Sequence, residues 1–358
     1  MLFHTLLILL QALNIQHSDK PLKENALTFK KELTLIDEEE GFYKRVNVGI
    51  SENETIALYD SGNKRVLLYN NTGKLLHQFG KEGKGPGEFS ENTFGPYITN
   101  TRIYMRQWDK TMVFDYEGKL LKEHKLQRAF GVTRSINDKL VIFINQTKET
   151  KFLRVEFSDD GMSYTTIKNP KYDEKYTLQM QKEWYKRPLD RHKWPWLLLP
   201  FNENYYIQSY PGAYRVEVLD KDRNVVANIK REFKRIKEVP DYTWQEDMKK
   251  RASKSTSESY KKSVAAYINN FNSTRDGYEH DITDLFVLDD YIIVETSTGS
   301  HKSLAYDVYT KDYKYYTHVK LELEKEYISS KIINNKLILT HNDEEEGPYS
   351  SIYSVKIH

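Results

Sequence analysis

Short apolar segments separated by polar turns recur along most of the chain. Residues 56–60 and 65–69 are two such segments on either side of a polar turn, and Asn70 to Gly73 form the next turn. Many of these segments are continuously apolar rather than alternating, which is typical of strands that are covered on both faces. A two-sheet sandwich would show more regular alternation. The pattern therefore predicts an all-β chain in which each sheet packs between neighbouring sheets.

The same scheme returns at a fixed period. Gly73-Lys-Leu-Leu is repeated 45 residues later as Gly118-Lys-Leu-Leu, and each glycine stands where a strand ends and a turn requires positive φ. Weaker copies of the strand pair follow at residues 140–144 with 152–157, 205–208 with 214–219, 291–294 with 304–309, and 336–340 with 351–355. A period of roughly 40 to 50 residues is the signature of propeller blades. Six copies predict a six-bladed β-propeller of four-stranded antiparallel blades.

One domain, residues 27–358, accounts for all six copies. Residues 27–36 read as a strand that precedes the first copy, whereas the last copy has room for about three strands before His358. Because a propeller must hide its sheet edges, we expect the N-terminal strand to complete the C-terminal blade. Two insertions break the period, an aromatic and basic loop at 169–200 and a segment of good helix formers at 237–281. The second insertion predicts one or two helices.

The first copy carries a family resemblance. The stretches Tyr59 to Tyr69, Thr72 to Leu76 and Phe79 to Phe89 resemble an NHL repeat. The chain is similar to the NHL-like six-bladed β-propellers, which are largely uncharacterised, exported proteins of Gram-negative bacteria. In such blades the residues that match Asp60, Asn63 and Arg65 fasten a turn and bridge neighbouring blades. The resemblance thus implies a structural repeat motif made of Asp60, Asn63, Arg65, Gly73 and Gly118.

The N-terminus bears on localisation. Residues 2–13 are apolar and are followed by the polar stretch Gln16 to Lys20. This run is too short to span a bilayer but matches the apolar part of a secretory signal. No Lys or Arg precedes it, so an N-terminal helix that is buried or rests on a membrane is the alternative. We interpret residues 1–20 as a signal peptide, which with the family resemblance predicts export to the periplasm or cell surface of a Gram-negative bacterium and no transmembrane span in the mature chain.

The charge balance and the absence of cysteine exclude several classes of partner and site. The 54 Lys and Arg nearly balance the 52 Asp and Glu, which leaves little net field to attract DNA or RNA, so we expect no nucleic acid partner. The absence of cysteine excludes disulfides, zinc–thiolate sites and thiol nucleophiles.

The 169–200 loop holds the candidate binding residues. Three of the five Trp lie in it together with several cations. Flat aromatic rings with polar edges suit stacking on sugars or on the side chains of a partner protein. The candidate ligand-binding residues are Trp184, Arg187, His192, Trp194 and Trp196. The alternative is a loop that buries its own indoles. A glycan, a peptide or a protein are the partners that this composition fits.

Motifs for catalysis are absent from the sequence. The ten His are scattered, and neither a His-Glu-x-x-His nor a Gly-x-Ser-x-Gly motif occurs, so neither a metal site nor catalytic residues are assigned. The glycines between Gly80 and Gly87 precede no helix and no Lys-Ser/Thr pair, which favours a connection between blades over a phosphate loop. Gluconolactonase-like propellers bind a divalent cation through carboxylates at the channel mouth. We expect no bound cofactor in this chain, but a divalent cation such as calcium in the channel is left open as the alternative. Asp109, Asp289, Asp290 and Glu295 are the candidate contributors to such a site.

Two functional classes follow. The first is an exported propeller that binds a ligand or a protein. The alternative is a propeller hydrolase or lyase, metal-dependent or not, with a site at the central channel. Fold does not choose between them because propellers host both, and the missing catalytic motifs favour binding.

Overall fold

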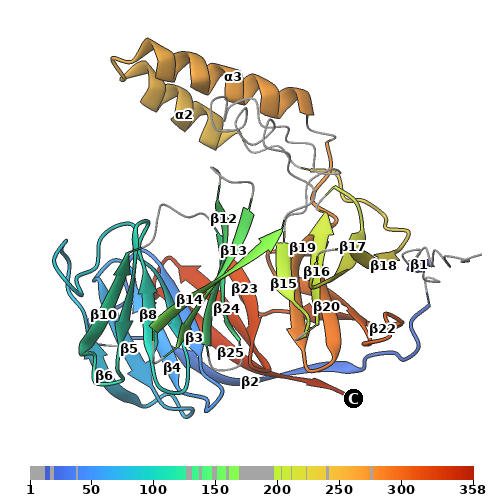
Figure 1. The fold of residues 1–358 in the computed structure, drawn as a ribbon, viewed down its shortest axis with the longest axis horizontal. Coiled ribbons are helices and arrows are strands. Elements are labelled where there is room, and N and C mark those ends of the chain that lie inside the picture. The colour runs from blue at the N-terminus through green and yellow to red at the C-terminus, as the bar shows by residue number, and fades with distance from the viewer. Residues whose placement is uncertain are drawn as a thin grey trace, which may run out of the picture. The chain divides into compact units, whose positions relative to one another are not determined.

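A computed structural model of the chain describes residues 13–16, 20–37, 39–125, 131–136, 139–146, 151–158, 161–168, 197–202, 204–210, 212–222, 224–238, 242–274 and 277–358. These residues form six sheets, five of four strands and one with a fifth strand added (Figure 1). The predicted six-bladed β-propeller is confirmed. The chain divides into two compact units, one of residues 1–24, 169–298 and 305–317, the other of residues 25–168, 299–304 and 318–358.

Three complete blades follow one another in the second unit. They consist of β3 (Val46–Ile50), β4 (Ile56–Asp60), β5 (Arg65–Tyr69) and β6 (Leu75–Phe79); β7 (Phe94–Ile98), β8 (Ile103–Arg106), β9 (Lys110–Phe114) and β10 (Leu120–Lys125); and β11 (Gly131–Ile136), β12 (Lys139–Gln146), β13 (Lys151–Ser158) and β14 (Gly161–Lys168).

The strand β4, apolar except for Asp60 at its end, is buried at every position because neighbouring blades cover both of its faces. Leu58 packs in a cluster with Ile338 and Ile352 of the last blade. Tyr59, the next residue, packs in a different cluster with Ile98 and Ile103 of the second blade. Successive side chains of a strand point to opposite faces, so an unbroken apolar run is what a strand between two blades requires.

The last blade is completed by the N-terminal strand. It contains β23 (Ser329–Ile333), β24 (Lys336–Asp343) and β25 (Gly347–Ile357), and β2 (Leu27–Leu35) pairs with β25 in antiparallel fashion (Figure 1). The leucines at the two ends of β2, Leu27 and Leu35, are both buried. The expected closure of the C-terminal blade by the N-terminal strand is confirmed.

Of the remaining two blades, one precedes the two helices in the chain and includes the fifth strand, and the other follows the helices. They consist of β15 (Leu197–Pro200), β16 (Tyr205–Tyr210), β17 (Arg215–Asp220), β18 (Val225–Lys230) and the added β1 (Leu13–Gln16); and β19 (Ile282–Leu288), β20 (Tyr291–Ser300), β21 (Ser303–Tyr309) and β22 (Tyr315–Glu322). The last four residues of the 169–200 insertion thus form a blade strand.

Two helices lie between β18 and β19 in the chain, α2 (Thr243–Ser253) and α3 (Glu258–Thr274), and they pack side by side (Figure 1). They confirm the predicted helical insertion. In the described part of the chain no helix is both long and apolar enough to cross a membrane.

Candidate functional site

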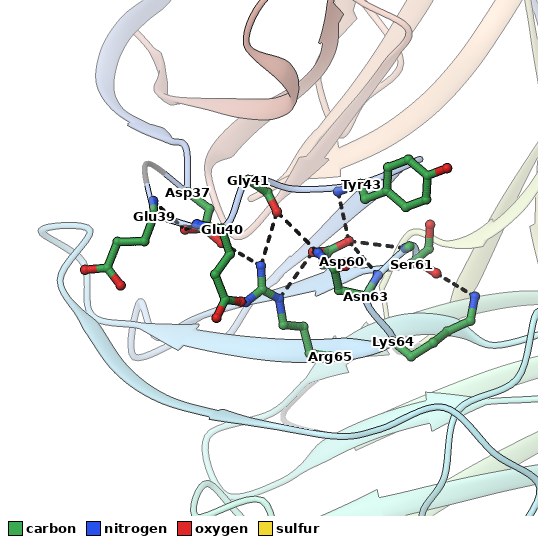
Figure 2. A network of polar contacts seen from close by, with 11 residues as sticks. Asp37, Glu39, Glu40, Gly41, Tyr43, Asp60, Ser61, Asn63, Lys64 and Arg65 are labelled. Atoms are coloured by element: carbon green, nitrogen blue, oxygen red, sulfur yellow. Dashed lines mark hydrogen bonds and ion pairs between the residues drawn. The ribbon is translucent and has the colours of Figure 1, made fainter.

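Three repeat-motif residues of the first blade, Asp60, Asn63 and Arg65, meet in one polar network (Figure 2). The Asp60 side chain is fully buried at the end of β4. Its Oδ1 accepts the backbone N–H groups of Tyr43, Gly62 and Asn63, each at 3.2 Å. Its Oδ2 accepts Asn63 Nδ2 at 2.7 Å. Asp60 therefore holds both its own turn and the backbone that leads into β3.

Arg65 joins this network to the connector between β2 and β3. Its Nε donates to Asp60 Oδ2 at 3.3 Å, its Nη2 to Asp37 Oδ2 at 2.5 Å, and its Nη1 to Glu40 (Figure 2). Burial alone would lower the pKa of Arg65, but the hydrogen bonds and charges of Asp37 and Asp60 together outweigh it and raise that pKa. The charged groups bind one another and so fasten the connector to the turn after β4. The repeat-motif role that the family resemblance implies stays a prediction.

Both repeat glycines adopt positive φ, +82° at Gly73 and +76° at Gly118. A Cβ at Gly118 would lie 2.4 Å from Cγ of Phe79, so only glycine fits there. The glycine-rich loop joins β6 to β7, and the N–H of Gly85 donates to Oε2 of Glu88 at 2.8 Å. This loop therefore places one of its own carboxylates against that backbone amide.

The five candidate ligand-binding residues lie outside the described residues. Trp184, Arg187, His192, Trp194 and Trp196 all belong to residues 169–196. Their role stays a prediction.

The candidate cation ligands do not form a group. Asp289 and Asp290 lie in the exposed turn before β20, with Asp290 3.6 Å from Nζ of Lys311. Glu295 is buried further along β20, roughly 17 Å away at the rise of a strand, and accepts a hydrogen bond of 3.0 Å from Thr283 Oγ1. Asp109 is exposed in the turn between β8 and β9. Among the described residues, no three His, Asp or Glu side chains are placed to hold a metal.

A buried cluster of tyrosines around Asp307 has no counterpart in the sequence analysis. Asp307 on β21 accepts Tyr214 Oη at 2.6 Å, Tyr315 Oη at 3.0 Å and Arg231 Nη1 at 2.7 Å. Burial, then the Asp307 charge, raises the pKa of Tyr214 far above its usual value. The high tyrosine content was the only signal of this cluster. Its polar groups satisfy one another, which is typical of a structural centre.

The hairpin of β16 and β17 repeats the geometry of the Asp60 hairpin with different chemistry. Tyr210 is paired with Arg215 across the hairpin, just as Asp60 is paired with Arg65. The Arg215 guanidinium lies 3.6 Å from the centre of the Tyr210 ring, a cation–π contact where the first blade has an ion pair. The shared five-residue spacing was visible in the sequence, whereas the exchange of Asp for Tyr concealed the match.

The helical insertion is held at its base by a structure that we call the neck, residues 235–238 and 277–281. The N–H of Glu238 donates to the carbonyl of Gly277 at 3.0 Å, and the N–H of Glu279 to the carbonyl of Ile236 at 2.8 Å. Arg235 Nε lies 2.7 Å from Asp281 Oδ1. The predicted limits of the insertion thus coincide with an antiparallel pairing of its two ends.

The two helices, residues 242–274, form what we call the arm, and the arm has its own hydrophobic core. Val264 and Ile268 of α3 pack with Ala252 of α2, and all three are buried. The Trp244 ring packs edge-on against Phe271, with centroids 4.9 Å apart. The arm is therefore ordered by contacts between its own helices.

Charge on the arm is uneven. It contains six Lys and Arg against three Asp and Glu, a net charge of +3, while the whole chain has +2. Lys249 pairs with Glu246 at 2.8 Å and Lys261 with Glu258 at 2.7 Å. The remaining cations, which we call the tip cations, are the exposed side chains of Lys250, Arg251, Lys254 and Lys262.

Comparison with known proteins agrees with the fold. The sequence profile of the family DUF5128, described as a 6-bladed β-propeller, matches residues 45–157. No curated protein matches the chain. The finer resemblance to NHL repeats stays a prediction.

Solved structures are similar at low identity. A member of the duf4221 family from Bacteroides vulgatus has a TM-score of 0.52 and 11% identity over 94% of this chain and 100% of its own. Virginiamycin B lyase from Staphylococcus aureus has a TM-score of 0.41 and 10% identity over 93% and 100%, and a luciferin-regenerating enzyme 0.44 and 9% over 93% and 97%. At 11% identity, the similarity to the Bacteroides vulgatus structure shows a shared fold and carries no statement about function.

Proposed function

We propose that this protein is an exported binding propeller that docks a partner protein through its helical arm. The observation that carries the proposal is the arm itself, a helix pair with its own hydrophobic core on a neck closed by hydrogen bonds and an ion pair. Export is inferred from the apolar segment at residues 2–13 and from the family resemblance.

Order in the arm favours a role in binding. Isolated helices of this length are marginal in water, so an arm without internal packing would be mobile. Val264, Ile268 and Trp244 provide that packing. A surface that is ordered before binding loses less conformational entropy when a partner docks. The arm is thus preorganised to present its surface.

The exposed surface of the arm fits an acidic protein. Tyr242 and Tyr260 are 48% and 40% exposed, and tyrosine and arginine are enriched in protein interfaces. The tip cations create a positive potential close to the arm, although the net charge of the whole chain is only +2. Such a potential steers an acidic partner toward the arm and weakens as salt is added.

The test uses the protein from Lys20 onward and a fluorescent peptide rich in Glu and Asp as the probe. We expect binding by anisotropy at low salt and at least about ten-fold weaker binding, equal to about 1.4 kcal/mol, after the combined changes Lys250→Glu, Arg251→Glu and Lys254→Glu. The matched control reverses three exposed lysines outside the arm, Lys74, Lys84 and Lys119. Equal loss in both variants would contradict docking at the arm.

A thermal-shift screen against divalent metals, glycans and peptides addresses the alternative class. Any ligand that binds only the folded state raises the melting temperature. A metal-specific shift that a chelator removes would support the hydrolase or lyase instead, provided that the tip variants bind the acidic peptide as well as the unchanged protein does.

A further inference from the structure

The blade that precedes the arm has an extra strand. In the described part of the chain the other five sheets have four strands each, whereas β1 adds to the outer edge of β18 as a fifth. The pairing is parallel, with Leu13 opposite Ala227, Ile15 opposite Ile229 and Gln16 opposite Lys230. The outer edge of β18 therefore accepts an extended segment.

The N-terminal segment uses strand edges repeatedly as it continues along the chain. After β1, the N–H groups of Leu22 and Lys23 donate to the carbonyls of Tyr315 and Tyr316 on β22, at 3.2 and 2.9 Å. It then forms β2. The N-terminal segment thus pairs with the outer strands of three sheets, β18, β22 and β25.

The two strands that the N-terminal segment forms, β1 and β2, differ in length. The strand β2 has nine residues and ends in buried leucines, whereas β1 has four residues. The edge that β1 covers, Val225–Lys230, carries a single charged residue, at its last position. Proteins protect free strand edges with charges, prolines or bulges, and the outward edge of β18 has no proline and one terminal charge.

We propose that the outer edge of β18 is a peptide-binding edge. In a chain that has lost its N-terminal segment, an extended segment of the partner protein adds to β18 as a parallel strand in place of β1. This inference rests on the proposed function, because it requires export with removal of that segment. Main-chain hydrogen bonds supply the affinity in strand addition, and alternate side chains supply the specificity. Leu13-Asn-Ile-Gln alternates apolar and polar residues, which is the pattern expected of the bound peptide.

The position of β18 in the chain links this edge to the arm. A parallel strand on β18 runs toward Lys230, and the neck begins at Arg235. Arg231, between them, is fixed by hydrogen bonds to Asp307 and to Tyr315 Oη at 2.7 and 2.6 Å. A partner that adds a strand to β18 is therefore directed toward the neck that supports the arm.

The test compares the full chain with a protein that starts at Lys20, using a labelled synthetic peptide of residues 10–19 as the probe. We expect the shortened protein to bind the peptide. The full chain should bind it at least about ten-fold more weakly, because the linked segment competes at an effective concentration of about millimolar. A scrambled peptide of the same composition is the control.

Main-chain recognition is tested with two N-methylated peptides, one methylated at Leu13 and Ile15 and the other at Asn14 and Gln16. In a parallel pair the amides of alternate residues point toward the partner strand. We therefore expect one of the two peptides to lose binding and the other to keep it. Hydrogen exchange should slow at the amides of Ala227 to Lys230 when the unmodified peptide binds.

Two results would overturn the inference: a folded shortened protein that does not bind the peptide, or equal binding of both methylated peptides. The outcome is separable from that of the proposed function. If the tip variants lose the acidic probe while no peptide adds to β18, only the present inference fails. If the peptide adds to β18 and the tip variants bind the acidic probe normally, docking at the arm fails instead.

Discussion

The buried carboxylate of Asp60 accepts three backbone N–H groups as well as the Asn63 amide and the Arg65 guanidinium. Asp60→Ala removes the acceptor of the three backbone N–H groups, while Arg65 keeps Asp37 and Asn63 keeps the Gly41 carbonyl. Removing one partner of a buried ion pair costs about 3–5 kcal/mol. We expect the free energy of unfolding to fall by about that amount in urea titrations.

The matched control is Asp115→Ala in the second blade. The Asp115 carboxylate also accepts a backbone N–H, that of Lys119 at 2.8 Å, but in an exposed turn. Loss of this single hydrogen bond should cost about 1 kcal/mol. Equal effects of the two substitutions would show that the network around Asp60 does not stabilise the blade as argued.

His341 on β24 makes the protein sensitive to mild acid. Its Nδ1 lies 2.6 Å from the carbonyl oxygen of Glu326, and its ring stacks on Tyr349 with centroids 4.4 Å apart. Burial lowers the pKa of His341, and the charges of Lys31 and Lys325 act in the same direction, while the hydrogen bond to Glu326 opposes them. The folded protein therefore favours the neutral ring.

The sign of the pH effect follows from the unfolded chain, in which His has a pKa of about 6.5. Below that pH and down to the lowered folded pKa, the unfolded state binds more protons, so stability falls as pH falls. We expect wild type to lose more stability between pH 7.5 and 5.5 than His341→Phe does, measured by urea midpoints. Equal losses of stability in wild type and His341→Phe would contradict this role of His341. The pKa of His124 is also lowered by burial, so some acid sensitivity remains.

At the scale of single elements, the arm should loosen without the propeller. Trp244 packs against Phe271 and against Tyr267, with centroids 4.9 and 6.1 Å apart. Trp244→Ala removes these contacts, and because this side chain is only half-buried we expect about 2 kcal/mol of local destabilisation, below the range for a fully buried Trp. Hydrogen exchange should quicken in α2 and α3 while the blade strands keep their rates. Tyr260→Ala, at an exposed position of α3, should leave the arm unchanged.

The presence of a helical insertion could be predicted because strand patterns give way to good helix formers in this part of the chain. The neck could not be predicted, since the bond between Glu279 and Ile236 joins residues far apart in sequence. Likewise the apolar runs at β4 and β5 predicted buried strands, whereas the pairing of Tyr210 with Arg215 carries no residue that repeats Asp60.

At the scale of the whole chain, periodicity predicted the six blades and the closing strand because both follow from hydrophobic patterns. The contacts between residues of different elements could not be predicted from these patterns. Arg65 binds Asp37 and Glu40, whose approach depends on how β2 enters the first blade. The strand β1 was interpreted only as part of a signal segment, since a four-residue parallel pairing has no sequence signature.

Closure by β2 leads to the last prediction, that a chain starting at Asp37 does not fold cooperatively. Leu27 and Leu35 are fully buried, and burying a leucine contributes about 1.5–3 kcal/mol. Loss of both removes about 3–6 kcal/mol, which is comparable to the lower end of the total stability of about 5–15 kcal/mol of a typical domain. The Nζ atom of Lys336 also loses its contact of 2.6 Å to Glu32. In addition, the outer edge of β25 loses its partner strand. A protein starting at Lys20, which keeps β2, is the control and should melt cooperatively.

Complementation separates closure from a general effect of truncation. A synthetic peptide of residues 25–36 should restore a cooperative transition to the chain that starts at Asp37, because it supplies both buried leucines and the partner strand of β25. The same peptide with Leu27→Asp and Leu35→Asp should not restore it, since burying an unpaired carboxylate is strongly unfavourable. Cooperative melting of the shortened chain without any peptide would show that the first and last blades hold together without β2, through contacts such as that of Leu58 with Ile338 and Ile352.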